Sequence, residues 1–123
     1  MSTPRFRRLP MALLLLGLPS LALAHAGLVR STPTAGATVA PTQQVELQFN
    51  ERVMPRATRI ELSMAHGRMQ MAVPSTSQDV AEDGHTLRVR FAKPLSAGDY
   101  RLQWRAVGED NHPMTGEYRF RVK

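Results

Sequence analysis

The sequence contains a histidine that a single proteolytic cut would turn into a bidentate metal chelate. His25 follows the small-residue pattern Ala-Leu-Ala at positions 22–24, which is typical of a leader-peptide cleavage site. After cleavage, the α-amine and the ring Nδ1 of His25 would close a six-membered ring on one metal ion. A histidine inside a chain offers one nitrogen only. The rest of the sequence must therefore supply the other ligands.

Asp110 and His112 are the candidates for those ligands. They stand two residues apart in a predicted loop, and in an extended conformation both side chains would project to the same face. Together with His25 they form a set of nitrogens and one carboxylate oxygen that suits tetragonal Cu(II). The α-amine must lose its proton to bind, so we expect the affinity for copper to fall below neutral pH.

Short Asp-x-His patterns are frequent by chance, so Asp110-x-His112 has a plainer interpretation. In that interpretation Asp110 caps a turn and His112 is solvated. A second copy, Asp83-Gly84-His85, leads directly into a predicted strand and is interpreted as a hairpin rather than a ligand pair. The first copy is favoured as a site because it coincides with a potential amino-terminal histidine.

The first 24 residues have the layout of a secretory signal peptide. Three arginines and no acidic residue precede an apolar run that is too short for a spanning helix, which needs about 20 residues. We therefore expect residues 1–24 to be removed and residues 25–123 to form one periplasmic domain. The alternative is an uncleaved membrane anchor.

Composition limits the partners and ligands of the mature domain. Without the leader, 13 of the 16 basic residues remain against 10 acidic ones, a net charge of +3. No basic block with interleaved aromatic residues is present, which argues against nucleic acid as a partner. The chain has no cysteine, so metal has to be held by nitrogen, oxygen or thioether donors, and the domain depends on its hydrophobic core.

The predicted fold is all-β: an Ig-like or cupredoxin-like Greek-key sandwich or barrel of about seven strands. No window has apolar residues at helical spacing, whereas short alternating or extended runs are separated by Gly and Pro turns. The predicted strands lie at 27–32, 44–50, 60–64, 69–73, 87–91, 100–106 and 118–122. The segment 75–84 is predicted to be a loop with a short extended piece around Val80.

These motifs together resemble the periplasmic CopC/PcoC copper-resistance proteins over nearly the whole mature chain. The resemblance rests on the residues that open the mature chain, on Leu47-x-Phe49-Asn50-Glu51, and on the segments 98–104, 110–113 and 116–122. It implies a cupredoxin-like barrel that binds Cu(II) through the His25 amine and imidazole, Asp110 and His112. It further implies that Glu51 lies near His25 and orients its ring.

The chain departs from that family's usual pattern at two positions of the loop. Asn111 stands where the family usually has glycine, and asparagine tolerates the left-handed backbone that glycine would adopt. Glu109 adds a carboxylate to which no role is assigned.

A methionine-rich segment is a candidate for a second, Cu(I) site. Some members of the family carry such a site in a methionine-rich loop with one histidine, and thioethers favour Cu(I) over Cu(II). The residues here are Met64, His66, Met69 and Met71. The methionines also continue the alternation of a strand, and the favoured interpretation is that they pack in the core.

Copper sequestration without chemical turnover, or delivery of copper to an inner-membrane transport protein, is the favoured function. A copper-dependent oxidative enzyme is the alternative, because polysaccharide monooxygenases also bind copper through an amino-terminal histidine. Asp110 occupies a position that such an enzyme would leave open, and the short chain has no evident flat aromatic face, so no polysaccharide is expected as a partner. An Ig-like interaction domain without metal is the third possibility.

Overall fold

The structure is a computed structural model, and it describes residues 27–123. His25 and the predicted leader lie outside these residues. Nine strands and one short 3-10 helix follow one another along the described chain. They are β1 (Leu28–Thr32), β2 (Thr38–Val39), β3 (Gln44–Phe49), η1 (Pro55–Ala57), β4 (Arg59–His66), β5 (Met69–Val73), β6 (Ser77–Val80), β7 (Thr86–Arg90), β8 (Gly98–Val107) and β9 (Pro113–Val122).

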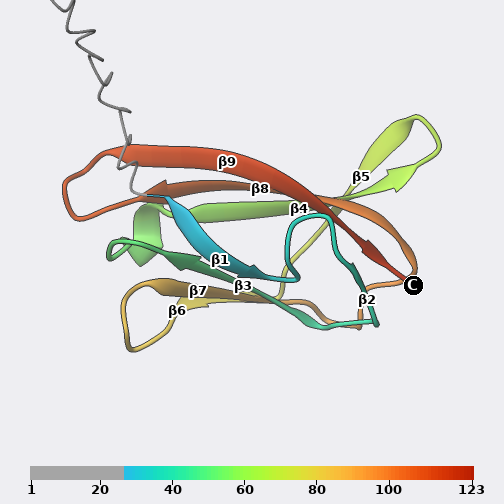
Figure 1. Cartoon of the computed structure of the whole chain (residues 1–123), viewed down its shortest axis with the longest axis horizontal. Helices are drawn as coiled ribbons and strands as arrows, with labels where there is room; N and C mark the ends of the chain where they lie inside the picture. The colour runs from blue at the N-terminus through green and yellow to red at the C-terminus, as the bar shows by residue number, and fades with distance from the viewer. Residues whose placement is uncertain (1–26) are drawn as a thin grey trace, which may run out of the picture.

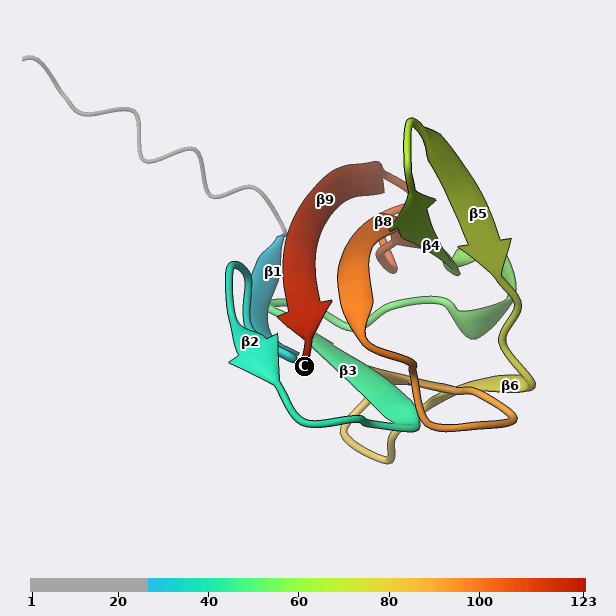
Figure 2. The ribbon, with the colours of Figure 1, turned by 90° about the vertical axis from the view of Figure 1, so that its right-hand side faces the viewer.

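The strands form two sheets that pack face to face, as Figure 2 shows from one end. One sheet has the order β1-β3-β7-β6, and the other has the order β2-β9-β8-β4-β5. All neighbouring strands are antiparallel except β2 and β9, which pair in parallel through Thr38 and Arg121. The predicted all-β sandwich is confirmed, with two open sheets instead of a closed barrel.

The core lies between the two sheets and follows the alternation in the sequence. Every second residue of β3 is buried, and the same holds for much of β7, β8 and β9. Among the aromatic residues, Tyr100 stacks on Phe120 at a centroid distance of 5.3 Å, and Tyr118 is tilted against both Phe120 and Trp104. Burial of these large apolar side chains is the main term that stabilises a domain without disulfides.

Two strands go beyond the seven that were predicted. β2 has two residues and β6 has four, and such short pieces carry too few alternating positions to be recognised from the sequence. β6 includes the extended piece expected around Val80. The prediction that Met69 and Met71 pack in the core was wrong: their exposed fractions are 69% and 51%. Their strand, β5, extends past the edge of the core.

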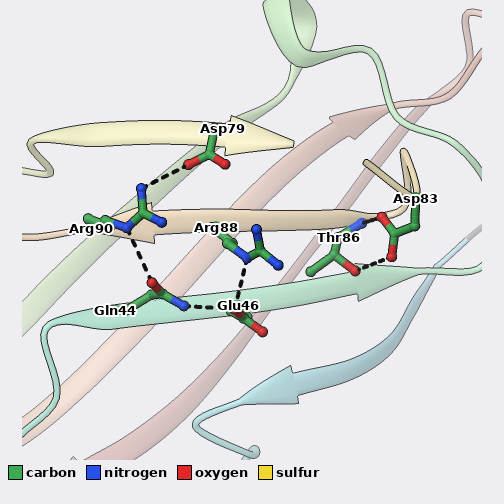
Figure 3. Close-up of polar contacts among 7 residues, drawn as sticks. All are labelled: Gln44, Glu46, Asp79, Asp83, Thr86, Arg88 and Arg90. Carbon is green, nitrogen blue, oxygen red and sulfur yellow. Dashed lines mark hydrogen bonds and ion pairs between the residues drawn. The ribbon is translucent and has the colours of Figure 1, made fainter. Parts of the chain in front are cut away.

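Polar side chains cover the outer face of the four-stranded sheet (Figure 3). Arg88 Nε lies 3.0 Å from Glu46 Oε1, and Arg90 connects Gln44 to Asp79. These contacts join strands β3, β7 and β6 by cross-strand pairs. Because the groups are largely exposed, each contributes well under about 1 kcal/mol. These polar side chains make the outer face of the sheet a solvent-facing surface, while the apolar side chains of the inner face pack in the core.

Tyr118 predicts a loss of stability at alkaline pH. Burial raises its pKa to about 12, and the nearby Ser31 hydroxyl offsets only part of that effect. The Tyr118 hydroxyl lies near that of Ser31 but forms no well-aligned hydrogen bond within residues 27–123. An unfolded tyrosine ionises near pH 10, so between about pH 10 and pH 12 the unfolded state releases a proton that the folded state keeps. The stabilisation is complete below that interval, and roughly 2 to 3 kcal/mol is lost as pH rises through it.

Urea unfolding at about pH 9 and about pH 11.5 measures this loss. We expect Tyr118→Phe to remove the pH dependence in this interval and to cost little at neutral pH, because its hydroxyl has no partner to lose. An equally steep decline in the variant would assign the effect to another group.

Candidate metal centre

Four loops that are far apart in the sequence meet at one end of the sandwich. Figure 1 shows the start of β1, the segment after β3, the β6–β7 turn and the β8–β9 loop at its left-hand end. The tip of the β4–β5 hairpin lies at the opposite end. Residues 108–112 therefore lie at the end where the described chain begins, which the proposed partnership with His25 requires.

Asp110 and His112 are brought together by a turn. The backbone N–H of Asn111 donates to the carbonyl of Gly108 at 3.0 Å, and that of His112 donates to Asp110 Oδ1 at 3.1 Å. Asn111 has a φ of 65°, the left-handed conformation expected where the family usually has glycine. The prediction that an extended segment aligns the two side chains was wrong, because the turn does so.

The two side chains present one nitrogen and one oxygen to solvent. His112 Nδ1 lies 3.7 Å from Asp110 Oδ2, too far for a hydrogen bond. Metal bonds to imidazole and carboxylate are about 2 Å long, so both atoms could bind one ion placed between them. The side chain of His112 is 83% exposed and that of Asp110 is 53% exposed. The capping role of Asp110 and the solvation of His112 also match the plainer interpretation, so geometry alone makes this pair a candidate.

A partly buried glutamate, Glu51, lies directly under the loop. Glu51 Oε1 is inaccessible to solvent and has no hydrogen-bond partner among the described residues. A side chain at Gly108 would collide with this oxygen and would lie 3.1 Å from Asp110 Oδ1. Glu51 and Asp110 therefore approach the same glycine. A buried carboxylate oxygen without a donor is costly, so the position of Glu51 Oε1 indicates a missing cationic or N–H partner.

Asn50 ties the first described residue to this end. The Gly27 N–H donates to Asn50 Oδ1 at 2.8 Å, and the Asn50 N–H donates to the Gly27 carbonyl at 3.0 Å. Gly27 is thereby held next to the residue that precedes Glu51. Across residues 27–123, no three His, Asp or Glu side chains come close enough to hold a metal ion. Asp110 and His112 could thus supply two ligands, and a metal site here would need another contribution.

The second Asp-x-His copy forms a turn at the same end. Asp83 Oδ1 accepts hydrogen bonds from the backbone N–H groups of His85 and Thr86, and Asp83 Oδ2 accepts one from the Thr86 hydroxyl (Figure 3). These hydrogen bonds lower the pKa of Asp83, and the bond from the Thr86 hydroxyl makes the largest contribution. His85 Nδ1 lies 3.1 Å from the Phe49 carbonyl. With one ring nitrogen occupied by the backbone, His85 acts as the turn residue that was predicted.

Glu109 has a partner that the sequence did not reveal. Arg52 Nε lies 3.2 Å from Glu109 Oε1. The two residues are far apart in the chain and neither belongs to a recognised motif, so only the fold could identify the pair.

The methionines and His66 gather on one face of the β4–β5 hairpin. Met64 is paired with Met71 and His66 with Met69, so all four side chains point to the same side. Met64 and Met71 also line an open groove of about 370 Å³ together with Phe91 and Leu95. Met64 Sδ already accepts a hydrogen bond from the Ser96 hydroxyl at 3.7 Å.

Fold and site together define a small two-sheet β-sandwich with an exposed Asp-x-His turn next to the start of its first strand. No helix within residues 27–123 is long and apolar enough to cross a membrane. The CopC domain matches residues 28–123, and the chain belongs to the CopC family.

Known relatives and solved structures are similar along most of the chain. Copper resistance protein C of Xanthomonas campestris pv. juglandis is 40% identical over 105 residues, with 83% of each chain covered. Copper resistance protein C of Escherichia coli is 35% identical and covers 89% of this chain and 90% of its own length. The crystal structure of PcoC, a methionine-rich copper resistance protein from E. coli, superposes with a TM-score of 0.74 at 34% identity, covering 81% of this chain and all of PcoC.

A substitution at Gly108 tests the close approach of Glu51. The backbone of Gly108 does not have a positive φ, so alanine is disfavoured by its contacts, chiefly with the Glu51 carboxylate and to a lesser degree with Asp110 Oδ1. We expect Gly108→Ala to lower the free energy of unfolding by about 1 kcal/mol, at the low end of the range for overpacking, because the Glu51 carboxylate ends a flexible side chain that can shift. Urea denaturation provides the measurement.

The double variant Gly108→Ala/Glu51→Ala is the matched control. It removes the colliding carboxylate and should recover most of the loss. Equal destabilisation of the single and double variants would mean that residue 108 is limited by something other than Glu51.

Proposed function

We propose that this protein handles copper in the periplasm and binds Cu(II) through His25, Asp110 and His112. Membership of the CopC family and the names of the relatives support a role in copper resistance. The observation that carries the site is the orphaned Glu51 carboxylate beside the exposed Asp110–His112 pair. Copper is the cargo of this site.

The contacts of Gly27 and Asn50 support the participation of His25. His25 is two residues before Gly27, and two residues of extended chain span at most about 7 Å. Gly27 is bound to Asn50, Glu51 is next in sequence, and Glu51 lies against Gly108 in the loop of Asp110. A short path of contacts thus leads from the beginning of the described chain to the Asp-x-His turn.

Glu51 would orient the amino-terminal residue in this proposal. Its buried Oε1 needs a hydrogen-bond donor. The ring N–H or the α-amine of His25 would provide that donor to the carboxylate. A carboxylate bound to a ligating imidazole fixes the ring and raises its basicity. Glu51 is therefore a positioning residue, and the copper ligands are His25, Asp110 and His112.

The proposal requires that residues 1–24 are removed. Only then does His25 have a free α-amine, and the following residues 25–123 form the copper-binding domain. An amine, two imidazoles and a carboxylate already fill a tetragonal Cu(II) site, which leaves no favourable position for a substrate. We therefore propose sequestration, or delivery to an inner-membrane copper transport protein, without chemical turnover.

Two variants of the mature protein test the ligand set. His25→Ala removes the imidazole of the amine chelate, and His112→Ala removes the second imidazole. We expect each to weaken Cu(II) binding by more than the roughly 10- to 100-fold loss typical of an outer-sphere partner. Competition titration against a chelator of known affinity measures the change in the protein with a verified His25 terminus.

His66→Ala serves as the control for this titration, because His66 lies on the hairpin at the other end of the sandwich. It should bind Cu(II) as tightly as the native chain. Tight binding that survives both His25→Ala and His112→Ala would refute the site.

The exposed methionine face favours a second candidate function, Cu(I) binding at the β4–β5 hairpin. Three thioethers and one imidazole share that face, and soft sulfur donors favour Cu(I). Met69 and Met71 are exposed, so burial in the core does not explain them. Cu(I) binding here would be independent of His25.

The variant Met69→Leu/Met71→Leu tests this second site. We expect it to lose Cu(I) affinity by tenfold or more, on the order of 1.4 kcal/mol, in an anaerobic competition titration. Its Cu(II) affinity and its unfolding free energy should stay unchanged. Met54→Leu is the control, because Met54 lies at the opposite end of the sandwich from the hairpin. Unchanged Cu(I) binding in the double variant would exclude the hairpin as a Cu(I) site.

A further inference from the structure

Arg52 makes contacts that join three of the loops around the candidate copper site. Its Nε lies 3.2 Å from Glu109 Oε1 in the β8–β9 loop, and its Nη1 donates to the Asp83 carbonyl in the β6–β7 turn at 3.3 Å. Arg52 itself lies in the segment that follows β3. One guanidinium therefore bridges two loops from a third.

The surface on which Arg52 rests is well defined. A side chain at Gly84 would lie 2.7 Å from Arg52 Cζ, so the guanidinium occupies the space over this buried glycine. Gly84 has a φ of 74°, and Asp83 fixes the turn through the three hydrogen bonds that it accepts. The Val53 N–H donates to the Gly84 carbonyl at 3.0 Å, and Val53 forms a bridge with Gly108.

Glu109 is the carboxylate that this arrangement controls. It precedes Asp110, the proposed ligand, and its side chain is 70% exposed. Arg52 is its one ion-pair partner within residues 27–123. Carboxylate oxygens are acceptable Cu(II) ligands, so a free Glu109 would compete with Asp110 for the metal.

We propose that Arg52 is a positioning residue that holds Glu109 away from copper and so determines that Asp110 supplies the carboxylate ligand. This inference rests on the proposed Cu(II) site. The pair is exposed, so its contribution to stability is small. The ion pair acts on the orientation of the Glu109 carboxylate. A small free-energy difference is enough to favour one of its two orientations over the other.

Electron paramagnetic resonance of Cu(II) tests the ligand choice. The native protein with one equivalent of Cu(II) at a fixed, slightly alkaline pH should give one species. Arg52→Met keeps an unbranched side chain in place of the arginine stem but removes the ion pair, and we expect a second set of copper hyperfine lines from molecules in which Glu109 binds. Arg52→Met/Glu109→Gln should return to one species, because the amide is a much poorer ligand.

Hydrogen exchange in the metal-free protein gives an independent measurement. We expect the hydrogen-bonded amides of Asn111 and His112 to exchange about two- to fivefold faster in Arg52→Met and in Glu109→Gln, the range that an exposed ion pair of under 1 kcal/mol allows. Arg68→Met removes the same charge from the hairpin turn at the other end of the sandwich and should change neither measurement.

The possible outcomes separate this inference from the proposed function. A single unchanged copper spectrum in Arg52→Met, or a second species that persists in the double variant, overturns the role of Arg52. Unchanged exchange at Asn111 and His112 also overturns it. In each of these cases, Cu(II) binding that still depends on His112 and His25 leaves the proposed site intact.

Discussion

The absence of a side chain at residue 108 lets a buried carboxylate lie against the loop that carries Asp110 and His112. Any larger residue would collide with Glu51. This contact brings the segment after β3 under the β8–β9 loop, and the Val53–Gly108 bridge holds the two together. Gly27 is bound to Asn50 in that same segment. The beginning of the described chain, a buried acid and the Asp-x-His turn are thereby connected through one small region.

The sandwich provides a rigid support for this region. Strands β8 and β9 pair over ten positions, from Gly98–Val122 to Val107–Pro113, and the loop is the short connection between them. On the inner face, Tyr100, Phe120 and Tyr118 pack into the core that holds these strands. Ligands on a short loop between two long paired strands are placed with little conformational freedom. By contrast, the side chains of Asp110 and His112 are accessible to solvent, as exchange of copper at the proposed site would require.

Much of the fold followed from the sequence because the strands that make the core alternate clearly. Residues 44–50 and 100–106 were predicted as strands, and β3 and β8 cover nearly the same ranges. The prediction for Met69 and Met71 failed since alternation identifies a face of a strand but not how far the core extends beneath it. The contacts of Arg52 with Glu109 and Asp83 join residues distant in sequence, so no local pattern could indicate them. Asp110 and His112 were selected as candidates from their spacing, although a turn and not an extended loop segment brings them together.

The central claim is that copper binds where the mature amino terminus meets the Asp110–His112 turn. Paramagnetic broadening in nuclear magnetic resonance spectra of the isotope-labelled mature protein, with a small amount of Cu(II) added, measures the position of the metal directly. The account predicts that the amide signals of Gly27, of residues 50–52 and of residues 108–112 broaden first, while those of the β4–β5 hairpin stay sharp. Selective broadening around Met69 and Met71, with the signals of residues 108–112 unchanged, would contradict it.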